Sequence, residues 1–183
     1  MDKNVLKLSF KLFLRLFGLD FCCLITSIFV MAPGGNQIVR VLLQAASIIV
    51  LVSFVYPICH KTGDLDAPLV NAGHRKRTSL KGLYAGTIAC LPFIISAIIL
   101  LLSKLFNAFF GFVNYYRIIN SIFFPFLYSI MPVDYTLSEL SSSSIVMAIC
   151  IQFVIPLICM FSYILGFNRF SFAEKLLYKK KAN

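Results

Sequence analysis

The stretch that decides the fold runs from Ser144 to Phe167 and reads SIVMAICIQFVIPLICMFSYILGF, without a charged residue. A helix needs roughly 20 predominantly apolar residues to cross the hydrocarbon core of a bilayer. Three earlier stretches are comparably long and apolar, over residues 12–31, 38–58 and 82–103. The sequence therefore predicts four membrane-spanning helices, the last over residues 144–167.

The overall composition supports a membrane protein. Of the 183 residues, 60% are hydrophobic and 13% are charged, whereas an ordinary soluble domain is about half apolar and about a quarter charged. One soluble core of this size could not hide so much apolar surface from water. The composition excludes a soluble globular protein and a disordered one, and it predicts an all-α integral membrane protein.

We expect residues 1–183 to form a single polytopic membrane domain. Residues 59–81 are predicted to be a cytoplasmic loop, and residues 104–143 an outer segment. The serine run Ser141–Ser144 is expected to cap the fourth span, because serine hydroxyls accept hydrogen bonds from the first N–H groups of a helix. Gly82 and Gly86 form a small-xxx-small pair, which predicts a close helix contact at the start of the third span.

The apolar stretch 105–131 allows two interpretations. Its polar or small residues recur at helical spacing: Asn107, Gly111, Asn114, Arg117, Ser121, Pro125 and Tyr128. It is either a fifth span or an outer helix that is interfacial, with this stripe toward water, or re-entrant. A fifth span would carry the basic tail Lys179–Lys181 across the membrane, against the positive-inside rule. We therefore expect an interfacial or re-entrant helix.

The basic residues predict the orientation of the chain. With four spans and both termini inside, the inner side holds fourteen of the 17 basic residues. These are Lys3, Lys7, Lys11, Arg15, Lys61, Arg75, Lys76, Arg77, Lys81, Arg169, Lys175, Lys179, Lys180 and Lys181. The formal net charge of +10 is thus a signal of topology, and no nucleic-acid partner is expected.

Both ends of the chain have the pattern of short amphipathic basic helices. Lys3, Lys7, Lys11 and Arg15 recur every four residues, so that they form one stripe on a helix. Such a helix lies on an anionic inner leaflet. We expect lipid-headgroup contacts from this stripe, from the loop residues Arg75, Lys76 and Arg77, and from the tail residues Lys179, Lys180 and Lys181.

The segment between the second and third spans contains the strongest candidates for chemistry. Asp64, Asp66 and His74 are weak candidates for a catalytic site, and together with His60 they are weak candidates for metal ligands. Their spacing matches no known zinc pattern. The favoured interpretation is structural, with turns at residues 62–64 and 71–73 and with both aspartates paired to Arg75, Arg77 or Lys81.

Two further polar residues, Asp20 and Gln152, lie within predicted spans. An ionisable group at membrane depth is costly and suggests function; a pairing of Asp20 near the inner interface is the alternative. Pro92 and Pro156 interrupt the third and fourth spans, and each frees a carbonyl group four residues earlier. Broken helices occur in transporters, but simple packing kinks are the favoured interpretation.

Three functions remain open, and we favour a non-enzymatic accessory, assembly or regulatory subunit of a membrane complex. The alternatives are a small oligomeric transporter or channel, and a membrane enzyme acting on lipid headgroups or lipid-linked substrates. No P-loop, GxGxxG or HExxH motif occurs, so no cofactor is expected. The expected partners are an anionic inner leaflet and either a membrane protein or a second copy. We expect a bacterial plasma membrane.

Overall fold

The computed structural model describes residues 3–30, 37–74, 78, 80–106, 108–109, 111–132 and 135–169. Helix accounts for 85% of these described residues, and no strand occurs among them. The long helices are α1 (Lys3–Val30) and α2 (Gln37–Asn71). The prediction of an all-α chain is confirmed for this part of the sequence.

The remaining helices are shorter. The third predicted span consists of α3 (Lys81–Ala89) and α4 (Leu91–Leu105). The segment that follows forms α5 (Phe112–Ile119), η1 (Ser121–Phe123) and α6 (Phe124–Ile130). The chain ends in α7 (Ser142–Cys150), η2 (Ile151–Phe153) and α8 (Val154–Phe167).

Two helices are long and apolar enough to cross a membrane, Val41–Asn71 and Ser142–Phe167. A third candidate is the pair α3 and α4, taken as one span bent by 59°. Within the described residues α1 does not qualify, and it carries the charged residues Lys7, Lys11, Arg15 and Asp20. Two to three of the four predicted spans are thus long and apolar enough to cross a membrane.

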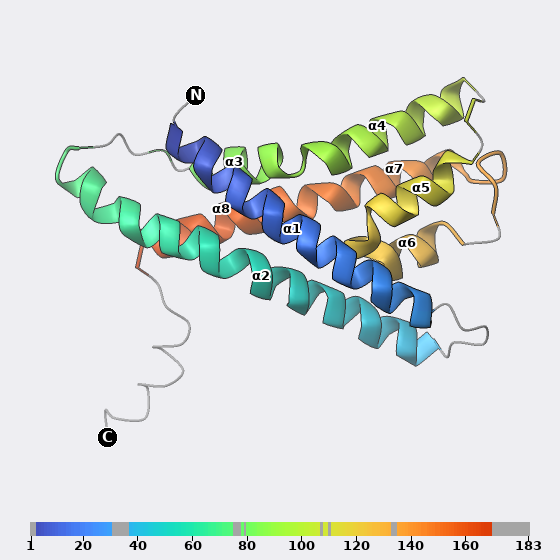
Figure 1. The fold of residues 1–183 in the computed structure, drawn as a ribbon, viewed down its shortest axis with the longest axis horizontal. Helices are drawn as coiled ribbons and strands as arrows, with labels where there is room; N and C mark the ends of the chain where they lie inside the picture. Colours follow the sequence, from blue (N-terminus) through green and yellow to red (C-terminus); the bar gives the residue numbers. More distant parts are fainter. Residues whose placement is uncertain are drawn as a thin grey trace.

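The helix ends gather at two ends of an elongated bundle (Figure 1). One end contains the start of α1, the end of α2, the start of α3 and the end of α8. We call it the basic end, because Lys7, Lys11, Lys61, Lys81 and Arg169 lie there. Here α1 and α8 each pack against both α2 and α3.

At the opposite end, α5, η1 and α6 form a helical hairpin that enters the bundle and returns (Figure 1). Pro92 lies in the first turn of α4, and the 59° bend after α3 directs α4 away from α1. The hairpin fills the resulting space: α5 packs against α4, η1 against α1, and α6 against α2 and α7. The bend at Pro92 therefore makes room for the segment that was ambiguous in sequence.

The structure differs from the predicted loop over residues 59–81, because α2 continues to Asn71. Gly63 has no turn role: a Cβ there would lie 2.7 Å from the backbone nitrogen of Phe167. The Thr62 hydroxyl donates to the Ile58 carbonyl one turn earlier. The predicted turn at residues 71–73 is present, and Gly73 takes a φ of 74° that favours glycine.

Two local predictions are confirmed. The Ser141 side chain caps α7 by accepting a hydrogen bond from the Ser144 N–H at 3.1 Å. Gly82 and Gly86 lie directly against α8, and a Cβ on Gly86 would be 2.9 Å from the Cβ of Cys159. These small residues let α3 and α8 approach closely.

Candidate functional site

A cleft of about 490 Å³ lies at the basic end, between α1, α2 and the first residue of α3. Most of its polar lining carries charge. It is lined by Asn4, Lys7, Leu8, Lys11, Thr62, Leu65, Asp66, Pro68, Leu69 and Lys81. It combines lysines expected to contact lipid headgroups with one of the candidate catalytic aspartates.

The position of α1 sets the position of the cleft lysines. One face of α1 is buried in the bundle through Val5, Leu8, Leu12, Leu16 and Leu19, which recur every three or four residues as a packed helix face requires. Lys7 and Lys11 lie beside this face, one turn apart, and both are exposed. The two ammonium groups therefore border the cleft without being buried.

Asp66, Lys81 and Tyr163 form a buried polar cluster behind the cleft. The Lys81 ammonium lies 2.5 Å from Oδ2 of Asp66, and the Tyr163 hydroxyl donates to the same oxygen at 2.9 Å. Asp66 is 4% exposed, Lys81 is 5% exposed and Tyr163 is 3% exposed. Two charges this deeply buried are tolerated only when they pair with each other and their remaining polar atoms are hydrogen-bonded. The cluster ties α2, α3 and α8 together.

The other candidates from this segment lie apart from that cluster. Asp64 is exposed on α2, where an oxygen lies 3.8 Å from Nε of Arg169. The His60 ring packs against Tyr56 at a centroid distance of 5.0 Å, and His74 is exposed in the turn after α2. Among the described residues, no group of three or more His, Cys, Asp or Glu side chains could hold a metal ion.

The predicted pairing of Asp66 with Lys81 is therefore present. Among the described residues, Asp64, Asp66 and His74 do not come together in a group that could hold a metal ion. Arg75, Lys76, Arg77, Lys179, Lys180 and Lys181 lie outside the described residues, as do the segment predicted to form a C-terminal amphipathic helix and the side chain of Lys3. Arg15 is exposed, and its guanidinium donates to the Phe54 carbonyl of α2 at 3.4 Å.

A second polar cluster lies in the middle of the bundle and contains Gln152. The Gln152 amide donates to the Tyr116 hydroxyl and to Oδ1 of Asn120, both at 3.0 Å. Asn120 donates in turn to the Ser96 hydroxyl at 3.0 Å, and Tyr116 donates to the Ala148 carbonyl at 2.8 Å. The cluster joins α4, the hairpin and the α7–η2 junction.

Asp20 fixes the tip of the hairpin to α1. Its carboxylate accepts hydrogen bonds from the Ser121 hydroxyl at 2.9 Å and from the Ile122 N–H at 3.0 Å. It thus satisfies a backbone donor at the start of η1, as a capping residue does. The partner of Asp20 comes from the segment 105–131.

The polar stripe in that segment does not face water throughout. Arg117 is 5% exposed, and Ser121 is 2% exposed. The Arg117 guanidinium donates to the carbonyls of Met131 and Pro132 at 3.2 and 2.6 Å, which follow the last turn of α6. Arg117 therefore supplies contacts within the hairpin and Ser121 a contact to α1, and the interfacial interpretation with the whole stripe toward water differs from the structure.

Sequence reasoning missed Tyr116, Asn120, Ser96 and Tyr163. Asn120 and Tyr116 fall outside the periodic stripe, and Ser96 and Tyr163 lie in largely apolar helices. The sequence signal for this pair is the four-residue spacing of Tyr116 and Asn120, which places both side chains on one face of a helix. Nothing in the chain pattern pairs that face with Gln152.

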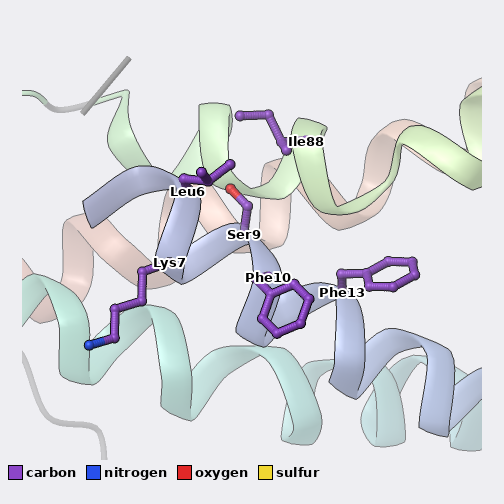
Figure 2. Close-up of a pocket in the computed structure, with 6 residues that line it drawn as sticks. All are labelled: Leu6, Lys7, Ser9, Phe10, Phe13 and Ile88. Carbon is purple, nitrogen blue, oxygen red and sulfur yellow. The ribbon is translucent and has the colours of Figure 1, made fainter. Parts of the chain in front are cut away.

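On the other side of α1 lies an apolar groove of about 500 Å³ (Figure 2). It is lined by Leu6, Lys7, Ser9, Phe10, Phe13 and Ile88. Figure 2 shows the Lys7 side chain directed from α1 toward α2, whereas Leu6 and Phe13 extend on the side of α3 and α4. Lys7 therefore lies where the groove meets the charged cleft.

Comparisons with known proteins add no relative: no family model, no curated protein and no solved structure matches the chain.

Proposed function

We propose that this chain is a non-enzymatic accessory, assembly or regulatory subunit of a membrane complex. One observation carries the proposal: two of the candidate side chains, Asp66 and Asp20, serve as links between helices. Asp66 is held by Lys81 and Tyr163, and Asp20 by the hairpin tip. Groups bound in this way stabilise a scaffold, because moving them would leave buried charge or backbone donors without a partner.

The exposed face of α1 supports a partner in the membrane. Leu14, Phe17 and Phe21 recur along it beyond the groove, and each is more than half exposed. Aromatic side chains supply much of the contact energy at protein interfaces. This face, opposite the leucines buried in the bundle, offers a surface for a helix of another membrane protein or of a second copy.

Purification of the full chain in a mild detergent tests the proposal. We expect a stoichiometric partner, or a defined homo-oligomer, to accompany the affinity-tagged protein. The double variant Phe17→Ala/Phe21→Ala should release it, while Ile95→Ala/Ile98→Ala, at exposed residues of α4, should not. A clean monomer that survives every mild detergent would contradict the proposal.

We also propose four membrane crossings with both termini inside a bacterial plasma membrane, α1 being the first. Lys7, Lys11, Lys61, Lys81 and Arg169 lie at the basic end, while Lys104 and Arg117 lie toward the opposite end. This asymmetry is the one expected from the positive-inside rule. In a cysteine-free background, His74→Cys should react with an impermeant thiol reagent only from inside, and Ser138→Cys only from outside. The reverse pattern would contradict the orientation.

A small oligomeric transporter is the second candidate, and the broken helices favour it. The α3–α4 bend and the hairpin place interrupted helices in the bundle, a device that transporters use around substrate sites. If ions follow this path, Asp20→Asn should abolish proton or potassium flux in liposomes, while Asp64→Asn should leave it unchanged. Equal flux in both variants would remove Asp20 from any path.

A further inference from the structure

We propose that the cleft at the basic end binds the phosphate headgroup of an anionic phospholipid, and that one of its acyl chains lies in the apolar groove beside α1. The cleft brings Lys7, Lys11 and Lys81 to one place, and among the described residues that line it Asp66 is the acidic one. The site does not depend on the accessory-subunit function proposed above, because it requires no protein partner.

The charge of the cleft favours an anion. Lys81 and Asp66 form an ion pair and balance each other, which leaves the two ammonium groups of Lys7 and Lys11. Within the part of the chain that the structure describes, neither of these lysines has a hydrogen-bond or ion-pair partner. Side chains four residues apart on a helix are neighbours, about 5–6 Å apart at Cβ. A phosphate group between them can accept hydrogen bonds from both.

The cleft walls strengthen this attraction. Leu8 is buried, and Leu65 and Leu69 extend from α2 toward the same space. Apolar walls lower the local dielectric constant, so a charge held there interacts more strongly than one in open water. A phosphate in the cleft would therefore be held better than one on an open lysine-rich surface.

The neighbouring groove favours a lipid as the source of the phosphate. Leu6, Phe10, Phe13 and Ile88 give it an apolar lining, and Lys7 borders both the groove and the cleft. Figure 2 shows the Lys7 amino group directed away from this apolar lining, toward α2. A phospholipid carries its charged phosphate directly beside its acyl chains, so that the phosphate can occupy the cleft while an acyl chain occupies the groove. A soluble phosphate would use the cleft alone.

Native mass spectrometry of the full chain in detergent tests the site. We expect one dioleoyl phosphatidylglycerol to bind with higher affinity than dioleoyl phosphatidylcholine. Lys7→Gln/Lys11→Gln should weaken phosphatidylglycerol binding roughly 25-fold, about fivefold for each lysine at a membrane surface. Both residues are exposed, so the variant should keep the wild-type circular dichroism spectrum and thermal unfolding midpoint.

The matched control is Lys61→Gln/Arg169→Gln, which removes the same charge from exposed positions at the same end but outside the cleft. It should keep wild-type phosphatidylglycerol binding. Equal loss in both variants would overturn the site and leave only a diffuse attraction to anionic lipid. Equal binding of the two lipids would overturn it as well.

Displacement of phosphatidylglycerol by millimolar inorganic phosphate would overturn the lipid as occupant, in favour of a soluble anion. An Ile88→Trp variant, whose larger side chain would occupy the groove, should weaken the binding of phosphatidylglycerol. Inorganic phosphate should still fail to displace the lipid from this variant.

Discussion

Gly166 of α8 packs directly against the backbone of His60 in α2, so closely that a Cβ on Gly166 would lie 2.7 Å from the His60 carbonyl carbon. Gly63, one turn further along α2, meets the backbone of Tyr163 and Phe167 in the same way. Two glycines on opposite helices thus set the distance between α2 and α8. In lipid, such close backbone contact is a main source of helix association, because burial of apolar side chains gains little there.

Gly166→Ala should therefore separate α2 from α8 and lower the free energy of unfolding by about 1–3 kcal/mol, the usual cost of overpacking. The measurement is the unfolding midpoint in detergent. Gly18→Ala is the matched control, because nothing lies within 4 Å of a Cβ at that helical position. That variant should be neutral or stabilising, since alanine favours helix over glycine by about 1 kcal/mol. Equal destabilisation by both would mean that α2 and α8 do not touch at Gly166.

The two aspartates of α2 should respond very differently to neutralisation. Asp66→Asn leaves the buried Lys81 ammonium without a counter-charge, and breaking a buried pair in this way costs about 3–5 kcal/mol. Asp64→Asn removes an exposed contact to Arg169 and should change stability by less than about 1 kcal/mol. Chemical unfolding of both variants makes the comparison.

A double variant separates the ion pair from the residues themselves. Asp66→Leu/Lys81→Met removes both charges, so it should recover most of the stability lost in Asp66→Asn. Asp66→Leu and Lys81→Met, measured singly, complete the cycle, and if their losses of stability add up to that of the double variant, the two side chains do not interact in the folded protein.

The Tyr116 hydroxyl should matter more than that of its neighbour Tyr115. Tyr116 is fully buried, and its hydroxyl both donates to the Ala148 carbonyl and accepts from Gln152. Tyr116→Phe removes both of these buried hydrogen bonds, at a cost of about 1–3 kcal/mol. Tyr115 is 65% exposed, so Tyr115→Phe should leave the unfolding midpoint unchanged. A silent Tyr116→Phe would show that the cluster contributes no stability.

Local chemistry made part of the fold predictable from sequence. The cap at Ser141, the close contact at Gly82 and Gly86, and the pairing of Asp66 with Lys81 each follow from a short pattern with a physical reason. In each case the competing structures were few, because an exposed helix start or an unpaired buried charge is costly.

Other features depend on contacts that a single segment does not encode. Gly63 looks like a turn residue, yet α2 continues through it, because the missing side chain allows the close approach of α8. The cluster of Gln152, Asn120 and Ser96 arises only when the bend at Pro92 admits the hairpin. Tertiary placement, which propensity does not describe, decided both.

The hairpin tip should loosen when Asp20 loses its carboxylate. Asp20→Ala removes the acceptor of the Ser121 hydroxyl and of the Ile122 N–H, so hydrogen exchange at the Ile122 amide should accelerate by about tenfold, corresponding to about 1.4 kcal/mol for the lost bonds. Asp20→Asn keeps one carbonyl oxygen as an acceptor and should show a smaller increase. Unchanged exchange in Asp20→Ala would mean that the hairpin is held by packing alone.

The turn before α7 should depend on pH through Glu139. The backbone N–H of Thr136 and, secondly, its hydroxyl donate to the Glu139 carboxylate at 2.8 and 2.9 Å, and these bonds hold the pKa of Glu139 below its ordinary value of 4.5. A carboxyl with a lowered pKa stabilises the folded turn fully above its unfolded pKa. That contribution is lost as the pH falls through the lower, folded pKa. Exchange of the Thr136 amide, corrected for its intrinsic rate, should therefore lose protection only at acidic pH, and Glu139→Gln should abolish this dependence. Because the carboxylate is exposed, the remaining helices should keep their protection across the same range, and a parallel loss in α8 would assign the transition to another group.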